Sequence, residues 1–313
     1  MKLDSQPTAF IFPGQGSQAV GMGKDLASAY EVAQKTFEEA NDILHSSFSN
    51  LMWDGPDTEL NDTVNTQPAL FVHSMASFRV FSHLYPDFKP IALAGHSLGE
   101  LSALAAAGAL SFESGLRLVR KRGELMKKAG EMNPGGMAAI LNLDIPSLEK
   151  VCAEASRENE SVQVANDNCP GQVVISGAKA AVERAMEGAK AAGAKRAIPL
   201  AVSIAAHSKL MASIQDEWNQ AVNDVGIGDA KIQVVGNVVG KPIQSAAELR
   251  LDIQSQLQSR VRWTETIQLL VGQGITTFVE VGTGNVLLGL IRRINSSATG
   301  FPLGNPSDLK ALD

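Results

Sequence analysis

One serine, in the segment Gly95-His96-Ser97-Leu98-Gly99, has the surroundings of a covalent nucleophile. The segment fits the pattern G-x-S-x-G, which places a serine on a sharp turn between a strand and a helix. The flanking glycines free this turn of Cβ clashes, and the N–H groups at the start of the helix face a developing oxyanion. The alternative is a Gly/Ser turn without chemistry. Because an apolar stretch precedes the segment and a helix-forming stretch follows, we predict that Ser97 carries an acyl group as an ester.

Such a serine needs a base, and the chain has 5 histidines. His73 and His83 lie on an expected long helix, and we interpret them as surface or packing residues. The side chain of His96 should point away from that of its neighbour Ser97. His207 follows the last strand of an expected inserted unit, where the chain returns to the larger part of the protein. We therefore predict His207 as the base, with a purely structural histidine as the alternative.

Two further segments could contact a substrate. Phe12–Gln18 (FPGQGSQ) is rich in glycine but matches neither common phosphate-binding pattern. We expect a tight loop that offers the backbone N–H of Gln15 to an oxyanion, with a plain turn as the alternative. Arg122 lies in a basic helical stretch, most of which is expected to be a solvated face. An arginine that faced the pocket would bind a carboxylate through two parallel hydrogen bonds, but the stretch alone does not select which one.

The elements around these residues alternate between short apolar runs and amphipathic stretches. This alternation predicts an α/β fold with a parallel sheet covered on both faces. The expected strands are 8–12, 91–94, 231–235 and 276–281. The expected helices are 66–84, with Pro68 near its first turn, and 97–107, 112–128 and 286–294.

A different order begins at the loop signal Asn133-Pro134-Gly135-Gly136. The residues that follow predict strands at 137–143, 162–165, 173–176 and 196–202, and helices at 145–156 and 178–192. This β-α-β-β-α-β order is the ferredoxin-like split unit. We therefore expect a large α/β catalytic domain of residues 1–132 and 204–313, with a small ferredoxin-like α+β domain of residues 133–203 inserted into it.

Composition excludes several classes of protein. The 313 residues carry 33 acidic and 27 basic side chains, so the net charge of −6 argues against nucleic acid as a partner. The 2 cysteines and the scattered histidines offer no metal site. Two cysteines cannot form a disulfide framework, which suggests a reducing compartment. The apolar stretch Leu101–Leu110 is too short for a membrane helix, which needs about 20 residues. We expect a cytoplasmic protein that does not enter a membrane.

These segments occur together with others, in one order, from Phe10 to about Ile294. The ordered segments are Phe12–Gln18, Thr66–Leu70, Gly95–Glu100, Arg122–Gly123, Met137–Ile140, Asn166, Pro170–Gly177, His207–Ser208, Val261–Trp263 and Glu280–Gly282. With this spacing they resemble the malonyl-CoA:acyl carrier protein transacylases of type II fatty-acid synthesis. They are also similar to the acyltransferase domains of polyketide and fatty-acid synthases.

The resemblance implies a hydrolase-like large domain with a ferredoxin-like insert. By motif position, Ser97 matches the acylated serine and His207 the base. Arg122 matches the arginine that pairs with the malonyl carboxylate. The other matched residues are Gln15 and Leu98, whose backbone N–H groups form the oxyanion hole, and Gln67, which has a supporting role near the pocket.

The resemblance also implies the substrates. Malonyl-CoA is the expected donor, and the phosphopantetheine thiol of acyl carrier protein is the acceptor in a transient complex. No cofactor of the protein's own is expected, and the family is commonly monomeric. The alternatives are a serine esterase or thioesterase, and the same transacylase chemistry serving polyketide synthesis or malonate decarboxylase.

Two positions depart from the family pattern. Ala206 stands where an aromatic residue often precedes the base, so the pocket wall formed by Ile204–Ala206 differs. Arg260 stands where proline often occurs. In relatives a main-chain carbonyl just upstream of this point accepts the histidine's other N–H, so we expect that carbonyl near Ser259 and no acidic member of a triad.

Overall fold

The computed structural model describes residue 3 and residues 6–312. Its larger sheet has six strands in the order β10-β9-β1-β2-β7-β8. Neighbouring strands are parallel except for the antiparallel pair β7–β8. The strands are β1 (Thr8–Phe12), β2 (Ala92–Gly95), β7 (Gln233–Val235), β8 (Pro242–Ile243), β9 (Thr277–Val281) and β10 (Thr299–Leu303).

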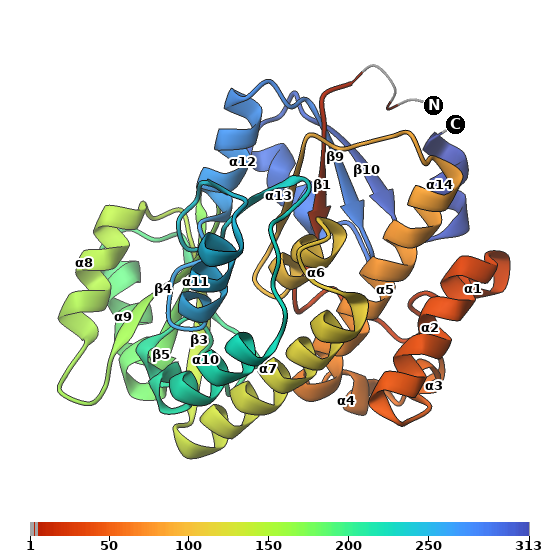
Figure 1. Cartoon of the computed structure of the whole chain (residues 1–313). Coiled ribbons are helices and arrows are strands. Elements are labelled where there is room, and N and C mark those ends of the chain that lie inside the picture. The colour runs from red at the N-terminus through yellow and green to blue at the C-terminus, as the bar shows by residue number, and fades with distance from the viewer. Residues whose placement is uncertain (1–2, 4–5, 313) are drawn as a thin grey trace.

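Helices cover both faces of this sheet (Figure 1). Phe10 and Phe12 of β1 enter one apolar cluster, whereas Ala9 and Ile11 enter another, because successive strand residues point to opposite faces. The helices that contribute to the first cluster include α5 (Thr63–Leu84), α6 (Gly99–Ala106) and α7 (Phe112–Met132). Those of the second are α12 (Trp263–Gly272) and α13 (Val286–Ile294). The predicted α/β class is confirmed, although β8 makes the sheet mixed.

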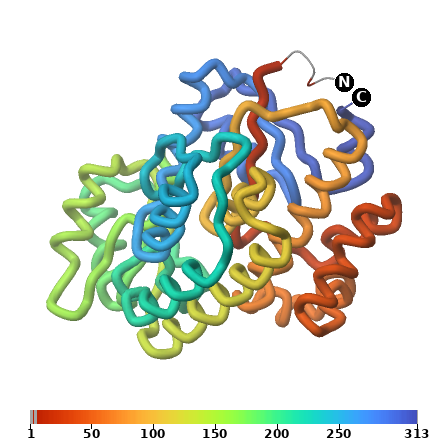
Figure 2. The backbone as a smooth tube through the Cα atoms, in the orientation of Figure 1, coloured from red at the N-terminus to blue at the C-terminus, as the bar shows by residue number. Residues whose placement is uncertain are grey.

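A second sheet of four strands lies beside the first, in the order β4-β5-β3-β6. All three pairings are antiparallel, and Figure 2 shows this unit on the opposite side of the molecule from the N-terminal helices. Its elements are β3 (Gly135–Leu141), α8 (Ile145–Ala155), β4 (Val162–Cys169), β5 (Gln172–Ala178), α9 (Lys179–Ala191) and β6 (Arg196–Pro199). The predicted order of these elements is observed, and the division at 133–203 stays a prediction.

Several element boundaries differ from the predictions. The helix expected from Thr66 begins at Thr63, because the Asp62 side chain accepts a hydrogen bond from the backbone N–H of Val64 and caps the helix earlier. Pro68 therefore lies inside the helix. The helix expected from Ser97 begins at Gly99, because Ser97 has a left-handed backbone that no α-helix accommodates.

Other elements were not predicted. They are β8 and β10, the helices α1 (Lys24–Ala29), α2 (Glu31–Leu44), α3 (Phe48–Asp54), α4 (Asp57–Leu60), α10 (Gln215–Asp224), α11 (Ala246–Gln256) and α14 (Pro306–Leu312), and the 3₁₀ helix η1 (Lys209–Ile214). Of these, α11 matters most for function because its last residue, Gln256, reaches the candidate site.

Within residues 3 and 6–312, no helix is both long and apolar enough to cross a membrane. The same residues contain no group of three or more His, Cys, Asp or Glu side chains that could hold a metal ion. Cys152 and Cys169 are both buried and unpaired.

Candidate active site

Ser97 lies on a tight turn between β2 and α6. Its φ is +52°, in the left-handed region, which costs a non-glycine residue about 1–3 kcal/mol. The turn packs so closely that a Cβ on Gly95 would lie 2.0 Å from the carbonyl oxygen of Gly99. A Cβ on Gly99 would lie 2.0 Å from the carbonyl oxygen of Phe12 at the end of β1. The two glycines of the sequence pattern are therefore required by backbone contact on both sides of the serine.

Gly99→Ala is expected to destabilise the protein by about 3 kcal/mol or more, because the added methyl meets backbone atoms that cannot move without displacing β1. Gly289→Ala is the matched control, since Gly289 lies in α13 with no atom within 4 Å of the added methyl. This control should be neutral or slightly stabilising. Urea unfolding of both variants checks the difference, and equal midpoints would contradict it.

Ser97 and His207 are in hydrogen-bond contact. Ser97 Oγ lies 2.7 Å from His207 Nε2, and His207 Nδ1 lies 2.9 Å from the carbonyl oxygen of Gln256. A carbonyl only accepts, so Nδ1 carries the proton and Nε2 is free to accept the proton of Ser97. The carbonyl at this distance belongs to Gln256, the last residue of α11 and three positions before Ser259, and the Ser259 backbone also forms a hydrogen bond with the imidazole. The acceptor is thus a main-chain carbonyl of the segment just upstream of Arg260, as expected.

The surroundings of His207 favour the neutral form of its imidazole. Burial, and after it the positive charge of Arg122, lower the pKa of His207 to about 3. The residue also has a left-handed backbone, with φ of +58°. A neutral imidazole in hydrogen-bond contact with a serine hydroxyl is the arrangement that general-base catalysis requires.

Arg122 of α7 is 1% exposed and lies beside the serine. Its Nη1 donates to Gln67 Oε1 at 2.9 Å, and its Nη2 donates to Gln256 Oε1 at 2.8 Å and to Ser97 Oγ at 3.2 Å. Its Nε is buried without a partner among the residues that the structure describes. Burial lowers the pKa of Arg122 to about 10, so it stays charged at neutral pH.

All the hydrogen-bond partners of this guanidinium are neutral amide or hydroxyl groups. A buried positive charge in such surroundings favours an anion that can bind both through charge and through paired N–H donors. The structure thus distinguishes Arg122 from its basic neighbours on α7: Arg117, for example, is exposed and forms an ion pair with Glu113. Gln67 holds the guanidinium and does not line the cavity.

Two backbone N–H groups near the serine are available to an oxyanion. Neither the Gln15 nor the Leu98 amide has a partner within the described part of the chain. The Gln15 side chain accepts a hydrogen bond from Thr63 Oγ1 at 3.0 Å, which holds the loop after β1. Leu98 is the N-cap of α6, where free N–H groups of a helix favour negative charge.

Sequence reasoning did not identify the side chains that brace this turn. Gln256 Nε2 donates to the carbonyl of Ser97 at 3.0 Å and to Glu100 Oε2. Asn237 Oδ1 accepts from the backbone N–H of Ser97 at 2.8 Å, and its Nδ2 donates to the carbonyl of Gly95 at 2.7 Å. Burial and the adjacent Asp252 raise the pKa of Glu100 well above its usual value. No local spacing in the sequence connects these residues to Ser97.

A cavity of about 500 Å³ opens onto Ser97, His207 and Arg122. Its apolar lining residues are Met126, Met137, Val174, Leu200, Ala201, Val202, Ile204 and Ala206. Its polar lining residues include His96, Asn166 and Asn168. The His96 side chain turns from Ser97 toward Asn168, where Nε2 and Oδ1 are 2.8 Å apart. The lining therefore comes from the small sheet and from loops and helices around the larger sheet, and it includes the charged Arg122.

Comparison with known proteins agrees with this site. A family model described as an acyl transferase domain matches residues 9–302. The malonyl CoA-acyl carrier protein transacylase of Bacillus subtilis is 44% identical over 304 residues, which are 96% of this chain and 95% of that protein. The transacylase of the same name from Haemophilus influenzae is 43% identical over 305 residues, 97% of each chain.

Solved structures give the same result. An acyl carrier protein S-malonyltransferase from Vibrio cholerae has a TM-score of 0.95 at 42% identity, covering 98% of this chain and 100% of that one. A malonyl-transacylase in complex with a type II PKS acyl-carrier protein has a TM-score of 0.94 at 42% identity, covering 98% of this chain and 99% of that one. The chain belongs to the acyl transferase domain family, together with the malonyl CoA-acyl carrier protein transacylases.

Proposed function

We propose that this protein transfers a malonyl group from CoA to the phosphopantetheine thiol of acyl carrier protein, through an ester on Ser97. The observation that carries the proposal is the buried Arg122 guanidinium, whose Nη2 lies 3.2 Å from Ser97 Oγ. An acyl group that ended in a carboxylate would place that carboxylate against the guanidinium while its carbonyl faced the serine. The printed names of the similar proteins support the same substrates.

In the first step His207 Nε2 takes the proton of Ser97, and Oγ attacks the thioester carbon of malonyl-CoA. The tetrahedral oxyanion accepts hydrogen bonds from the N–H groups of Gln15 and Leu98. When the intermediate collapses, the carbon–sulfur bond breaks and the CoA sulfur receives the proton from His207. The products of this half-reaction are CoA thiol and a malonyl ester of Ser97.

The second step reverses the first with a different thiol. His207 takes the proton of the carrier-protein thiol, and the sulfur attacks the serine ester. Collapse breaks the bond between carbon and Ser97 Oγ, and His207 returns its proton to the serine. One thioester replaces another, so we expect a reversible reaction with ping-pong kinetics.

A serine esterase or thioesterase is the second candidate, since it would use the same serine and histidine. Against it, His207 Nδ1 contacts the Gln256 carbonyl rather than a carboxylate, and simple hydrolysis has no use for a buried arginine. The similar transacylase solved with an acyl-carrier protein supports a protein thiol as acceptor. The carrier protein in that complex belongs to a type II PKS. Malonyl transfer to a carrier of polyketide synthesis would use the same two chemical steps and differs from the proposal only in the acceptor protein.

The test is incubation with malonyl-, acetyl- and methylmalonyl-CoA, read by intact mass with and without carrier protein. We expect a malonyl adduct on Ser97 that persists in water and is lost to the carrier thiol. Rapid loss in water alone would identify a hydrolase, and the absence of any adduct would overturn the proposal.

The expectations of a monomer, a cytoplasmic location and domains at 1–132 with 204–313 and at 133–203 stay predictions.

A further inference from the structure

The carbonyl group of His207 has an unusual partner in the small sheet. Gln163 lies on β4, and its Nε2 donates to the His207 carbonyl at 3.1 Å and to the Gln258 carbonyl at 3.0 Å. Across residues 3 and 6–312, no other donor reaches either carbonyl. One half-buried carboxamide therefore connects the residue that contacts Ser97 to the segment that follows Gln256.

One of these carbonyls belongs to His207 itself, and the other lies two residues after Gln256, whose carbonyl accepts the Nδ1 proton. The relative position of these two backbone segments determines how the imidazole is oriented toward Ser97. The left-handed backbone of His207 is a strained conformation, which persists only where surrounding contacts hold it. Gln256 lies two positions before Gln258 and supplies the carbonyl that accepts the Nδ1 proton. The carboxamide of Gln163 thus binds both the backbone of His207 and the segment Gln256–Gln258, which contains the acceptor of the Nδ1 proton.

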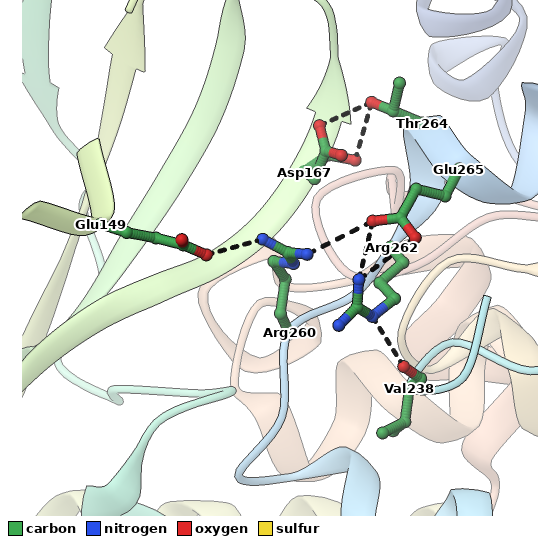
Figure 3. Close-up of polar contacts among 7 residues, drawn as sticks. All are labelled: Glu149, Asp167, Val238, Arg260, Arg262, Thr264 and Glu265. Carbon is green, nitrogen blue, oxygen red and sulfur yellow. Dashed lines mark hydrogen bonds and ion pairs between the residues drawn. The ribbon is translucent and has the colours of Figure 1, made fainter. Parts of the chain in front are cut away.

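The segment beyond Gln258 is anchored to the same strand. Val261 donates its N–H to the Ala165 carbonyl at 2.8 Å and accepts from the Asp167 N–H at 2.9 Å, which extends the small sheet at the edge of β4. Thr264 Oγ1 donates to Asp167 Oδ1 at 2.6 Å. Figure 3 shows this contact beside the ion pairs of the same segment.

Arg260 adds ion pairs in two directions. Its Nη1 lies 3.1 Å from Glu149 of α8, and its Nη2 lies 3.3 Å from Glu265 of α12, which also binds Arg262 (Figure 3). The Arg260 side chain is 17% exposed, so these contacts are partly shielded from solvent. Residues 260–264 are therefore held by β4, α8 and α12, and Gln163 of β4 binds the carbonyls of Gln258 and His207.

We propose that Gln163 is a positioning residue, which aligns His207 with its backbone acceptor and so fixes the direction of Nε2 toward Ser97. The proposal rests on the proposed function, in which His207 is the base. Gln163 lies outside the set of residues that line the cavity, so it acts through His207 rather than on the substrate. The small sheet then contributes to the chemistry, in addition to forming one wall of the cavity.

The test uses Gln163→Leu, which removes both donors but keeps an apolar stem, and Gln163→Glu, which places acceptor oxygens against two carbonyls. We expect kcat for malonyl transfer to fall about tenfold in Gln163→Leu and further in Gln163→Glu. The loss is limited in size because the alignment of His207 supplies only part of the rate acceleration that a general base contributes. The KM for malonyl-CoA should stay within about twofold, since the substrate contacts are unchanged. Gln172→Leu on β5 is the matched control, and we expect its kcat to equal that of the unaltered protein.

A second measurement separates positioning from folding. The Nδ1 proton of His207, bonded to the Gln256 carbonyl, should give a slowly exchanging downfield proton resonance. We expect this resonance to shift or broaden in both Gln163 variants and to be unchanged in Gln172→Leu. Gln163→Met provides a further apolar variant if the leucine does not fold.

The outcomes distinguish the two proposals. If the unaltered protein forms no malonyl ester, the proposed function fails. If it forms the ester and a folded Gln163 variant retains both the kcat and the resonance, only the positioning role is overturned. A variant with a lower melting temperature but unchanged kcat and resonance shows a merely structural role and also overturns it.

Discussion

Ser97→Ala is expected to abolish malonyl labelling and to lower kcat for transfer by at least about 10⁴-fold, because the variant has no oxygen to carry the acyl group. His207 and the free amides of Gln15 and Leu98 would remain, but they act only on an attack that no longer occurs. Binding of malonyl-CoA should persist, since Arg122 keeps its contacts to Gln67 and Gln256. Intact mass and calorimetry measure the two effects.

Ser203→Ala is the control for this experiment, because Ser203 is a second serine that lines the cavity. We expect it to be labelled at the same rate as the unaltered protein. Peptide mapping should place the adduct on Ser97 in both the unaltered protein and the control. An adduct on Ser97→Ala at a rate near that of the unaltered protein would show that another residue is the nucleophile.

Arg122→Ala is expected to lower kcat/KM for malonyl-CoA by about 10²-fold or more, since a charge-assisted pair with a carboxylate is worth about 1.5–3 kcal/mol per hydrogen bond. Acetyl-CoA lacks the carboxylate and leaves the buried guanidinium unpaired in the unaltered protein. Removing the guanidinium should therefore raise acetyl transfer relative to malonyl transfer. Rates of acylation with the two thioesters give the selectivity directly.

Arg117→Ala is the matched control, because it removes the same side chain from an exposed position on the same helix. It should leave the ratio of malonyl to acetyl transfer unchanged. Arg122→Lys is expected to retain part of the malonyl rate, because an ammonium keeps the charge but loses the planar pair of donors. The assignment of Arg122 is wrong if malonyl transfer in Arg122→Ala is unaffected and acetyl transfer does not improve.

Much of the fold follows from local patterns. The strand Thr8–Phe12 and the helix Val286–Ile294 were predicted at their observed bounds, because each is a compact apolar or amphipathic run with clear ends. The helices between residues 24 and 60 were not predicted. Three of them, α1, α3 and α4, have seven residues or fewer, whereas α2 has 14 residues and buries Ala33, Phe37 and Ala40 at helical spacing, a pattern that was visible in the sequence.

The sequence by itself determined the turn at Ser97 and the order of segments that places the chain in its family. The information for the turn is local. The backbone approaches Gly95 and Gly99 so closely that neither position can carry a side chain, and the two glycines therefore stand two residues before and two residues after Ser97. The sequence also contained Arg122, but among several basic residues of one helix. The resemblance to the family selected Arg122 among them, and its burial against Gln67 and Gln256 gives the physical reason.

Tertiary structure alone decided which side chains brace the serine turn and which backbone and side-chain groups hold the imidazole of His207. The Gln256 carbonyl lies 49 positions from His207 in the chain, and Gln163 lies 44 positions from it. A backbone carbonyl has no residue signature, because every residue carries one. Which carbonyl reaches the imidazole depends on where α11 ends and how the small sheet holds the next segment. The acylated serine can thus be identified from its neighbours in sequence, whereas the alignment of its base is a property of the assembled fold.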